Sequence, residues 1–337
     1  MIMVEPCVPP LAFVQLLASQ ALEPDAVARF RRVMIREGVS ESTMVERDVQ
    51  APLRWFREVY PALDSAQATH LGRACAAQAQ LTTFGPLSLP LVSAGSVAEI
   101  VELLTYLPLI STALSPQLHH SDQGLTVGFT GHTGDPDLDR LVITYCGSAL
   151  VRLLKLLVGD MSTVTLHLAW SAPPGLADDS DVVSGQLAFD APISFLRVPA
   201  ETLSEVCRFS DPIAYRHAIA ELEKALERRN GPLSFSRTVR LLVDEGDVLR
   251  SSQSVADELS MSASTLKRRL ADEGTTFREL RETSLRERAV LRLLERTATV
   301  SEIASDLGYS DLTNFSHAFK RWTGQSPSQF QREQGVR

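Results

Sequence analysis

The sequence predicts an α+β N-terminal domain followed by an all-α domain with two helix-turn-helix motifs. Helical and strand-like patterns mix in residues 1–210, Asn230-Gly231-Pro232 breaks the chain, and two similar helix-turn-helix patterns follow the break. A chain of 337 residues is also long for one core and comfortable for two. We therefore expect domains at residues 1–210 and 231–337, with a linker helix at 211–230 between them.

The N-terminal domain is expected to begin with helices and to continue with strands. Residues 10–36 should be largely helical, because apolar residues recur there at helical spacing, at Leu11, Val14, Leu17 and Ala18. Ser96 and Glu99 have the spacing of a capping box, which predicts a helix over 96–104. Further helices are predicted at 54–60, 66–79 and 138–158, and strands at 124–129, 164–170 and 191–199.

The helix predicted at residues 211–230 begins with Asp211 as its cap and Pro212 at its first position. A narrow apolar seam runs along it, formed by Tyr215, Ile219, Leu222 and Leu226. The seam has two interpretations, namely a helix packed on its own domain or a linker and dimerisation helix. Two heptads are short for a coiled coil, which favours the first interpretation.

The more informative helix-turn-helix pattern lies at residues 300–322. Gly308 permits the positive φ of a tight turn between two helices, and Asp311 can cap the second helix. The first helix carries three apolar residues on one face and the second carries two aromatic residues four apart: Ile303, Ala304 and Leu307, then Phe315 and Phe319. Residues four apart share a helix face, so we expect both aromatic rings in the core.

The same pattern occurs once earlier in the chain. Residues 254–259 predict a short first helix, residues 260–262 a turn, and residues 264–270 a second helix that closes near Gly274. Leu266 and Leu270 repeat the spacing of the two phenylalanines, and Leu266 precedes Phe315 by 49 residues. A single pattern of this kind is weak, whereas two copies in register are a specific signal.

Four short motifs lie in the second half of this region: Ile303-Ala304, Gly308-Tyr309-Ser310-Asp311, residues 315–324 and Ser326-Pro327-Ser328-Gln329-Phe330. On these motifs, the segment from about Leu233 to Arg332 resembles the DNA-binding domain of AraC/XylS transcriptional regulators. By order and pattern, the N-terminal domain is similar to the arabinose-binding-type domain that accompanies some of these regulators, including the ornithine-responsive ones. The ligand does not carry over from this similarity.

The resemblance implies a sequence-specific regulator of transcription that binds double-stranded DNA through both second helices. Each such helix enters a major groove, so one protomer reads roughly 20 base pairs. The long helix expected at 277–294 joins the motifs and fixes their separation. The DNA-binding residues implied are Ser264, Lys267 and Arg268 in the first groove, and Thr313, Asn314, Ser316 and His317 in the second, with Lys320 and Arg321 beside them. An activator of this family would also contact RNA polymerase.

The net charge of −8 at first argues against a nucleic-acid partner. However, residues 251–337 contain 13 Lys and Arg against 12 Asp and Glu, so the acidic excess lies elsewhere. DNA binding needs a cationic face rather than a cationic domain. Local basic clusters meet this need at Lys267-Arg268-Arg269, at Arg278 with Arg281, and at Lys320-Arg321.

The N-terminal domain shows little chemistry in its sequence. His119-His120 and His132 lie near several aspartates, but the surrounding Gly, Pro, Ser and Asp favour a solvated loop around a strand over a metal site. We therefore expect no metal and no cofactor. Trp170, Phe189, Phe195 and Arg197 could line a small-molecule pocket, or the aromatic residues could be plain core.

No catalytic motif occurs before residue 210, so we do not expect an enzyme. The function expected is control of transcription by a small-molecule effector that binds the N-terminal domain. The alternatives are an effector-independent dimeric regulator and an enzyme domain with an appended DNA-binding module. We expect a cytoplasmic protein, because the sequence shows no signal-peptide pattern and no membrane span and its four cysteines are scattered. A second copy of the chain is a further expected partner, which would form a homodimer.

Overall fold

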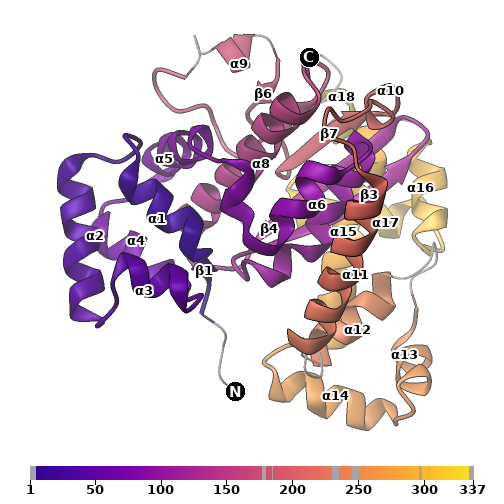
Figure 1. The fold of residues 1–337 in the computed structure, drawn as a ribbon. Coiled ribbons are helices and arrows are strands. Elements are labelled where there is room, and N and C mark those ends of the chain that lie inside the picture. Colours follow the sequence, from indigo (N-terminus) through magenta and orange to yellow (C-terminus); the bar gives the residue numbers. More distant parts are fainter. Residues whose placement is uncertain are drawn as a thin grey trace. The chain divides into compact units, whose positions relative to one another are not determined.

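The computed structural model describes residues 5–176, 180–183, 185–229, 235–244, 250–295 and 298–333. The chain divides into two compact units, residues 2–229 and 230–337, whose helices and strands are shown in Figure 1. The predicted break at Asn230-Gly231-Pro232 lies outside the described residues.

The N-terminal unit begins with a group of helices around a short ribbon. These elements are β1 (Cys7–Val8), α1 (Pro10–Ala18), α2 (Pro24–Arg36), α3 (Glu41–Glu46), β2 (Ala51–Pro52), α4 (Arg54–Val59) and α5 (Ser65–Ala77), with β1 and β2 antiparallel. Residues 10–36 are largely helical, as expected, and form two helices because Pro24 starts a new helix at its first position. Of the expected apolar face, Leu17 is buried as predicted, but Ala18 is exposed, and the buried side also includes Phe13 and Leu16.

Aromatic rings from three of these helices form one core. The rings of Phe13 and Phe30 lie 5.3 Å apart, and those of Phe30 and Phe56 lie 5.0 Å apart, both edge to face. Trp55 joins them from α4, 5.7 Å from Phe13. The helices predicted at 54–60 and 66–79 are confirmed as α4 and α5.

A five-stranded sheet forms the second part of this unit. Its strands are β3 (Leu114–Ser121), β4 (Gly124–Gly131), β5 (Thr165–His167), β6 (Leu187–Ala188) and β7 (Phe195–Pro199), in the order β3-β4-β7-β5-β6. All neighbours are antiparallel except β5 and β6. Strands were predicted at the positions of β4, β5 and β7, although β5 and β7 are shorter than expected. β3 and β6 were not predicted.

Short helices connect the helical group to the sheet and cover its ends. They are the 3₁₀ segments η1 (Leu81–Leu87) and η2 (Leu103–Leu109), and the helices α6 (Ser88–Ser93), α7 (Val97–Glu102), α9 (Ser180–Val183) and α10 (Ala200–Leu203). The side chain of Ser96 caps α7 as expected, accepting a hydrogen bond from the Glu99 N–H. The carboxylate of Glu99 accepts from Gly95 rather than from Ser96, so the capping box is shifted by one residue.

The central helix α8 (Pro136–Leu157), predicted at 138–158, contacts both α5 and the sheet (Figure 1). Two glycines permit these close contacts. A Cβ on Gly72 of α5 would lie 2.8 Å from the Leu141 carbonyl oxygen, and one on Gly147 would lie 2.5 Å from the Leu166 side chain on β5. The core of the helical group and the core above the sheet therefore share α8.

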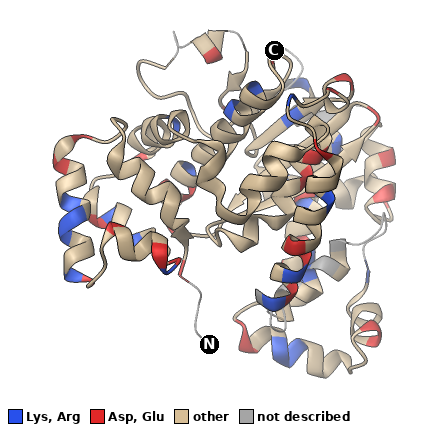
Figure 2. Ribbon diagram, in the orientation of Figure 1, with Lys and Arg blue, Asp and Glu red and all other residues tan. Residues whose placement is uncertain are grey.

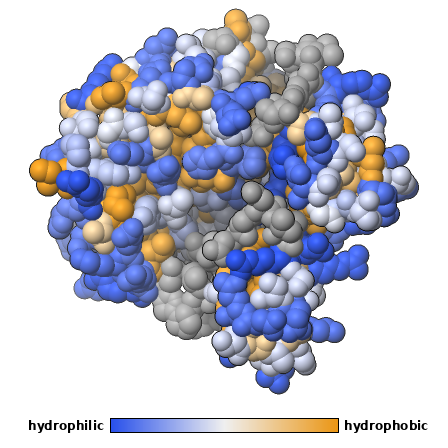
Figure 3. Space-filling view, turned by 90° about the vertical axis from the view of Figure 1, so that its right-hand side faces the viewer, coloured by the Kyte–Doolittle hydropathy of each residue, from blue (hydrophilic) through white to orange (hydrophobic). Residues whose placement is uncertain are grey.

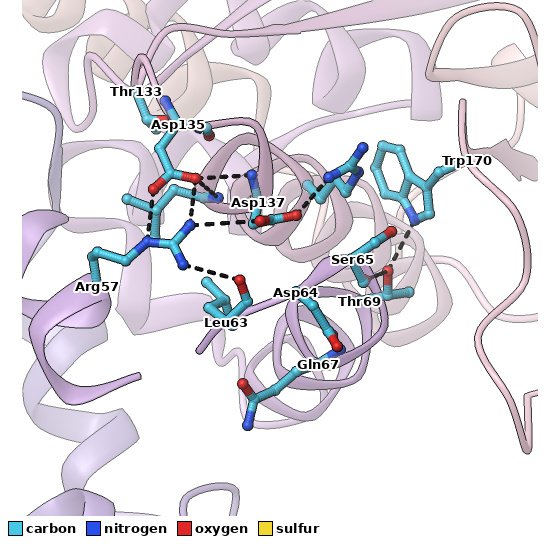
Figure 4. A network of polar contacts seen from close by, with 12 residues as sticks. Arg57, Leu63, Asp64, Ser65, Gln67, Thr69, Thr133, Asp135, Asp137 and Trp170 are labelled. Carbon is cyan, nitrogen blue, oxygen red and sulfur yellow. Dashed lines mark hydrogen bonds and ion pairs between the residues drawn. The ribbon is translucent and has the colours of Figure 1, made fainter. Parts of the chain in front are cut away.

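A polar network fixes the start of α8 (Figure 4). Asp135 accepts hydrogen bonds from the backbone N–H groups of Asp137 and Leu138, at 3.0 and 3.3 Å, and so caps the helix. The same carboxylate binds the guanidinium of Arg57 on α4, and this hydrogen bond lowers the pKa of Asp135. Arg57 also donates to the Leu63 carbonyl at 2.9 Å, which links three segments.

Helix α11 (Pro212–Arg229) packs on α6 and η2 of the N-terminal unit. Its cap is Asp211, which accepts from the N–H groups of Ile213 and Ala214. Leu222 is buried, and Tyr215, Ile219 and Leu226 pack against the same core. The apolar seam of the predicted linker helix is therefore covered within its own unit.

Among its described residues, the C-terminal unit contains helices and no strand. It contains α12 (Phe235–Asp244), α13 (Ser252–Glu258), α14 (Ala263–Asp272), α15 (Phe277–Glu295), α16 (Val300–Asp306), α17 (Leu312–Thr323) and α18 (Pro327–Glu333). Within the described parts of both units, no helix is long and apolar enough to cross a bilayer. The face in Figure 3 shows apolar residues in separate groups among hydrophilic ones.

Candidate nucleic-acid interface

The second helix-turn-helix consists of α16 and α17. Thr299 and Glu302 form a capping box at the start of α16, with each side chain accepting from the backbone N–H of the other residue. Gly308 has the positive φ expected, at 79°, and the Asp311 side chain caps α17 by accepting from the Asn314 N–H at 2.8 Å. The roles predicted for Gly308 and Asp311 are thus confirmed, whereas the capping box of Thr299 and Glu302 was not predicted.

The apolar side of α17 is held by an aromatic cluster. Phe315 and Phe319 have no exposed surface, which confirms the expected helix phase. Their ring centroids are 5.8 Å apart, and Phe319 meets the ring of Phe330 on α18 at 5.2 Å. Tyr309 lies against Phe315 at 5.4 Å. Because one side of α17 is fixed in this way, its other side faces outward.

The first helix-turn-helix consists of α13 and α14. The side chains of Ser251 and Ser262 cap the two helices, and Leu266 and Leu270 are buried on the inner side of α14. The turn contains Ser260 at a φ of 52°, in the left-handed region that Gly308 occupies in the other motif. The expected fold of this motif is confirmed, although α13 begins two residues earlier than predicted.

The two motifs are not related by one constant offset. The second helices are offset by 49 residues, as the caps Ser262 and Asp311 show, but the first helices Ser252–Glu258 and Val300–Asp306 are offset by 48. The difference is one additional residue in the turn before α17. The single register predicted from Leu266 and Phe315 therefore holds only for the second helices.

The structure places the predicted DNA-binding residues mainly on the outward sides of α14 and α17. On α14, Ser264, Lys267 and Arg268 are exposed. On α17, all predicted residues are exposed except Ser316, which is partly buried: Thr313, Asn314, His317, Lys320 and Arg321. Figure 2 shows the basic stretch on α14. Nearly all of these side chains can thus be reached from solvent.

Two of these residues already have partners within the unit. The side-chain amide of Asn314 donates to the carboxylate of Asp311. Arg321 forms an ion pair with Glu282 on α15, and the indole N–H of Trp322 donates to the same carboxylate at 3.1 Å. The hydrogen bonds from Trp322 and then Arg321 lower the pKa of Glu282. Arg321 is therefore oriented by α15.

A groove of about 460 Å³ lies between α13, α15 and α17. Arg278, Arg281 and Arg321 line it, together with Glu282, Tyr309 and the first residues of α13. Arg278 and Arg281 were recognised as a basic cluster in the sequence but were not included among the predicted binding residues. Their spacing of three on one helix is the signal that pointed to a shared face.

Polar contacts attach α12 to the end of α14 and to α15. The backbone N–H groups of Phe235 and Ser236 donate to Glu273 at 2.7 and 2.8 Å. Arg240 forms an ion pair of 2.6 Å with Glu287 on α15, a side chain that is only 8% exposed. The cation of Arg269 lies over the Phe235 ring, 5.3 Å from its centroid. Helix α12, which was not predicted, packs against α13 and α14 of the first motif and against α15.

Comparison with known proteins agrees with this arrangement. A family model described as the arabinose-binding domain of AraC transcription regulators matches residues 28–206, more than half of the chain. The chain belongs to the AraC family of transcription regulators. A second family model, described as a helix-turn-helix domain, matches residues 255–333, which include both motifs of this AraC-family chain.

Curated relatives of this AraC-family regulator are similar over much of their length. The HTH-type transcriptional regulator VqsM of Pseudomonas aeruginosa is 27% identical over 268 residues, covering 74% of this chain and 80% of that protein. The HTH-type transcriptional regulator Rv1395 of Mycobacterium tuberculosis is 29% identical over 275 residues, covering 75% of each. The ornithine utilization regulator of P. aeruginosa is 28% identical over 188 residues, covering 54% of this chain and 55% of that protein.

The three histidines considered for a metal site, His119, His120 and His132, lie on and beside a strand rather than in a loop. His119 and His120 are on β3, paired with Thr126 and Leu125 of β4, and the imidazole Nε2 of His132 contacts the Ser115 hydroxyl at 2.8 Å. The nearby Asp135 and Asp139 are used as a helix cap and as an acceptor from Thr133. Among the described residues, no group of three or more His, Cys, Asp or Glu could hold a metal ion.

The aromatic residues considered for a ligand pocket are mainly core. Phe189 and Phe195 are buried, and the His167 ring stacks on Phe195 at 4.3 Å. Trp170 donates its indole N–H to the Thr69 hydroxyl at 2.9 Å, while Arg197 is exposed and donates to Gln123. None of these four residues lines the apolar cavity of this unit, which lies near α8 instead.

Proposed function

We propose that this regulator reads an asymmetric DNA site of roughly 20 base pairs by placing α14 and α17 in successive major grooves. The observation that carries the proposal is shared by both helices. Each buries two apolar residues four apart and presents polar or basic side chains to solvent. Helix α15, which joins the motifs, sets their separation.

The side chains suggest which bases each helix reads. Lys267 and Arg268 can donate to the O6 and N7 atoms of guanine, whereas Asn314 suits the N6 and N7 atoms of adenine. Asn314 retains its carbonyl oxygen and one N–H for this contact while the other N–H is directed at Asp311. Lys320 and Arg321, together with Arg278 and Arg281 in the adjoining groove, are suited to phosphates.

Replacement of Arg268 by alanine tests the base-reading role. The variant should lose about 1–3 kcal/mol at its preferred base pair and show a flattened preference there, in binding titrations on a randomised operator. The matched control is Arg269→Ala on the same helix, because Arg269 is directed at Phe235. That control should weaken binding evenly across sequences. An unchanged base preference in the Arg268 variant contradicts the assignment.

We further propose that residues 231–337 form a DNA-binding domain that works alone and that residues 1–210 sense a small-molecule effector. The isolated C-terminal fragment should bind the operator and lose affinity as salt rises, because Lys267, Arg268, Lys320 and Arg321 displace counterions. The log–log salt slope should be shallower than for a strongly basic domain. Gel shifts over a salt series measure the operator affinity of the fragment and its salt slope. A fragment that is unfolded, or that still responds to the effector, contradicts this division.

Effector binding would shift the population of DNA-competent states. Thermal shift of the protein with a panel of metabolites tests this role, and a stabilising metabolite that remains chemically unchanged supports a sensor over an enzyme. If no metabolite binds and the chain dimerises, the effector-independent dimeric regulator is favoured. An activator would also need a contact with RNA polymerase, which a transcription assay with purified polymerase would detect.

A further inference from the structure

An apolar cavity of about 120 Å³ lies within the N-terminal unit, between the helical group and α8. Its wall is formed by α1, α5, η1, η2 and α8, and most lining residues are aliphatic, such as Leu104, Leu107, Leu150 and Leu153. An engineered cavity of about 150 Å³ with such a wall binds benzene. The space therefore suits a small organic molecule.

The lining includes no charged side chain. Most of its polar groups are already used, since Thr83 donates to Gln15 at 2.6 Å and Ser111 donates to the Cys7 carbonyl at 2.8 Å. A carboxylate or an ammonium group would lose its hydration here and gain no counter-charge, which is costly. A molecule with many hydroxyl groups would likewise find too few partners.

Tyr145 of α8 is a further polar group in the lining. No hydrogen bond of its hydroxyl occurs among the described residues, and the side chain is partly buried and lines the cavity. Burial raises the pKa of this phenol, so the hydroxyl keeps its proton. The Tyr145 hydroxyl thus offers the cavity a neutral donor in a mostly apolar surrounding, which a single acceptor on a ligand would satisfy.

The thiols in the wall do not point to a covalent ligand. Cys75 and Cys146 both line the cavity, and burial raises the pKa of each to about 12. The thiolate is the nucleophilic form of cysteine, and it is scarce at neutral pH under these conditions. Binding is therefore expected to be non-covalent.

We propose that this cavity binds a small, uncharged, mostly apolar molecule whose one hydrogen-bond acceptor meets the Tyr145 hydroxyl. This inference rests on the proposed effector function and names the chemical class of the effector. The molecule contacts α8, which belongs to both cores of the unit.

Three probes of nearly the same shape test the proposal on the full chain. Acetophenone carries one acceptor, cumene replaces it with an apolar group, and benzoate replaces it with a charge. Calorimetric titration should rank acetophenone first, with cumene about three- to tenfold weaker, the worth of one hydrogen bond. Benzoate should bind at least about tenfold more weakly than acetophenone, because its charge is desolvated without a partner.

Tyr145→Phe should reduce acetophenone binding to the level of cumene and leave cumene unchanged. The matched control is Tyr60→Phe, a partly buried tyrosine of the same unit outside the cavity wall, which should keep the ranking. The proposal is overturned if benzoate binds as well as acetophenone, if no probe binds, or if the Tyr145 variant keeps the preference for acetophenone. The conservative change removes only an oxygen atom, and a thermal melt confirms that each variant is folded.

The same experiment separates this proposal from the effector function. Operator affinity is measured with and without saturating acetophenone. If the probe binds through Tyr145 but operator affinity does not change, the cavity assignment stands and the effector function fails at this site. If a charged metabolite alters operator affinity while the three probes do not bind, the effector function stands and the cavity assignment fails.

Discussion

The two helix-turn-helix motifs have the same architecture but are stabilised in different ways. The second rests on aromatic rings, since Phe315 and Phe319 pack with Phe330 and Tyr309. The first buries two leucines and is supported by α12, which Glu273 and the Arg240–Glu287 pair attach to the rest of the unit. Aromatic packing in one motif and polar attachment to a neighbouring helix in the other can therefore stabilise the same helix-turn-helix architecture.

Their outward sides also differ. Helix α14 presents the basic run Lys267-Arg268-Arg269, whereas the exposed start of α17 carries the uncharged side chains of Thr313 and Asn314. The buried positions keep the helix in place, and the outward positions are free to vary. A duplicated motif can thus present two different surfaces to two grooves, which suits the asymmetric DNA site proposed above.

Removing an aromatic ring from the second motif should have the largest effect. Phe315→Ala and Phe319→Ala should each destabilise the C-terminal unit by about 3–5 kcal/mol through lost burial and a cavity. Leu266→Ala is the counterpart in the first motif, with a cost expected toward the lower end of about 2–5 kcal/mol. Denaturant melts of residues 231–337 measure these values. If a phenylalanine variant keeps its denaturant midpoint of unfolding but loses DNA affinity, that ring contacts DNA at the surface and does not belong to the core.

Breaking the polar attachment of α12 should come next. Glu287→Ala leaves the Arg240 guanidinium without its carboxylate in a largely buried position, so we expect a loss of about 3 kcal/mol. Arg292→Ala, which removes the ion pair of α15 with the exposed side chain of Asp306, is the control and should cost at most about 1 kcal/mol. Equal losses in the two variants would show that burial of the pair does not matter.

The turns offer a smaller and reciprocal test. Gly308→Ala should cost about 1 kcal/mol, because φ is 79° there and a Cβ disfavours that region. Ser260→Gly relieves the same strain in the first motif but frees the unfolded chain, so a gain of at most about 0.5 kcal/mol is expected. Thermal melts of both variants decide it. A loss of stability in the Ser260 variant would mean that its side chain contributes to the turn.

The smallest effect expected is a difference in acid sensitivity between the first helices. Hydrogen bonds from the Thr299 backbone and side chain lower the pKa of Glu302 in the folded state. Its contribution to stability is therefore present above the unfolded pKa and is lost as pH falls through the lower folded value. Glu302→Gln should flatten the decline of stability in acid. Ser254→Gln, at the matching position of α13, should leave that decline unchanged.

Sequence patterns predicted the C-terminal unit well because its signals are local. Gly308 and Asp311 lie where the turn and the cap of the second motif were predicted, and the pattern at 300–322 covers α16 and α17 to within one residue at its outer ends. The helix expected at 277–294 matches α15 to within one residue. Helix α12 was not predicted, although Val239 and Val243 are buried, because it lies outside the two repeated motifs. The DNA-binding residues implied by the family resemblance were placed on the outward sides, but the pairing of Arg321 with Glu282 joins residues 39 apart and has no local signal.

The N-terminal unit was predicted less well because long-range pairing defines it. Strand β3 is an edge strand whose residues are mostly half-buried, so it lacks a clear apolar alternation. Residues 124–129 of β4 are buried throughout, so their alternation did not indicate an exposed face. The cavity could not be predicted, because its wall is assembled from residues between Cys7 and Leu153.

The additional residue in the turn before α17 bears on how such motifs can be exchanged between proteins. A graft could copy α13 and α14 onto α16 and α17 at the 49-residue spacing of the second helices. It would then align Leu259 with Gly308 and place a branched side chain at a φ of 79°. Engineers who wish to change the DNA specificity of one half should therefore join the segments inside the turn. Transplanting only residues from the cap onward, Ser262 or Asp311, keeps each first helix with its own turn.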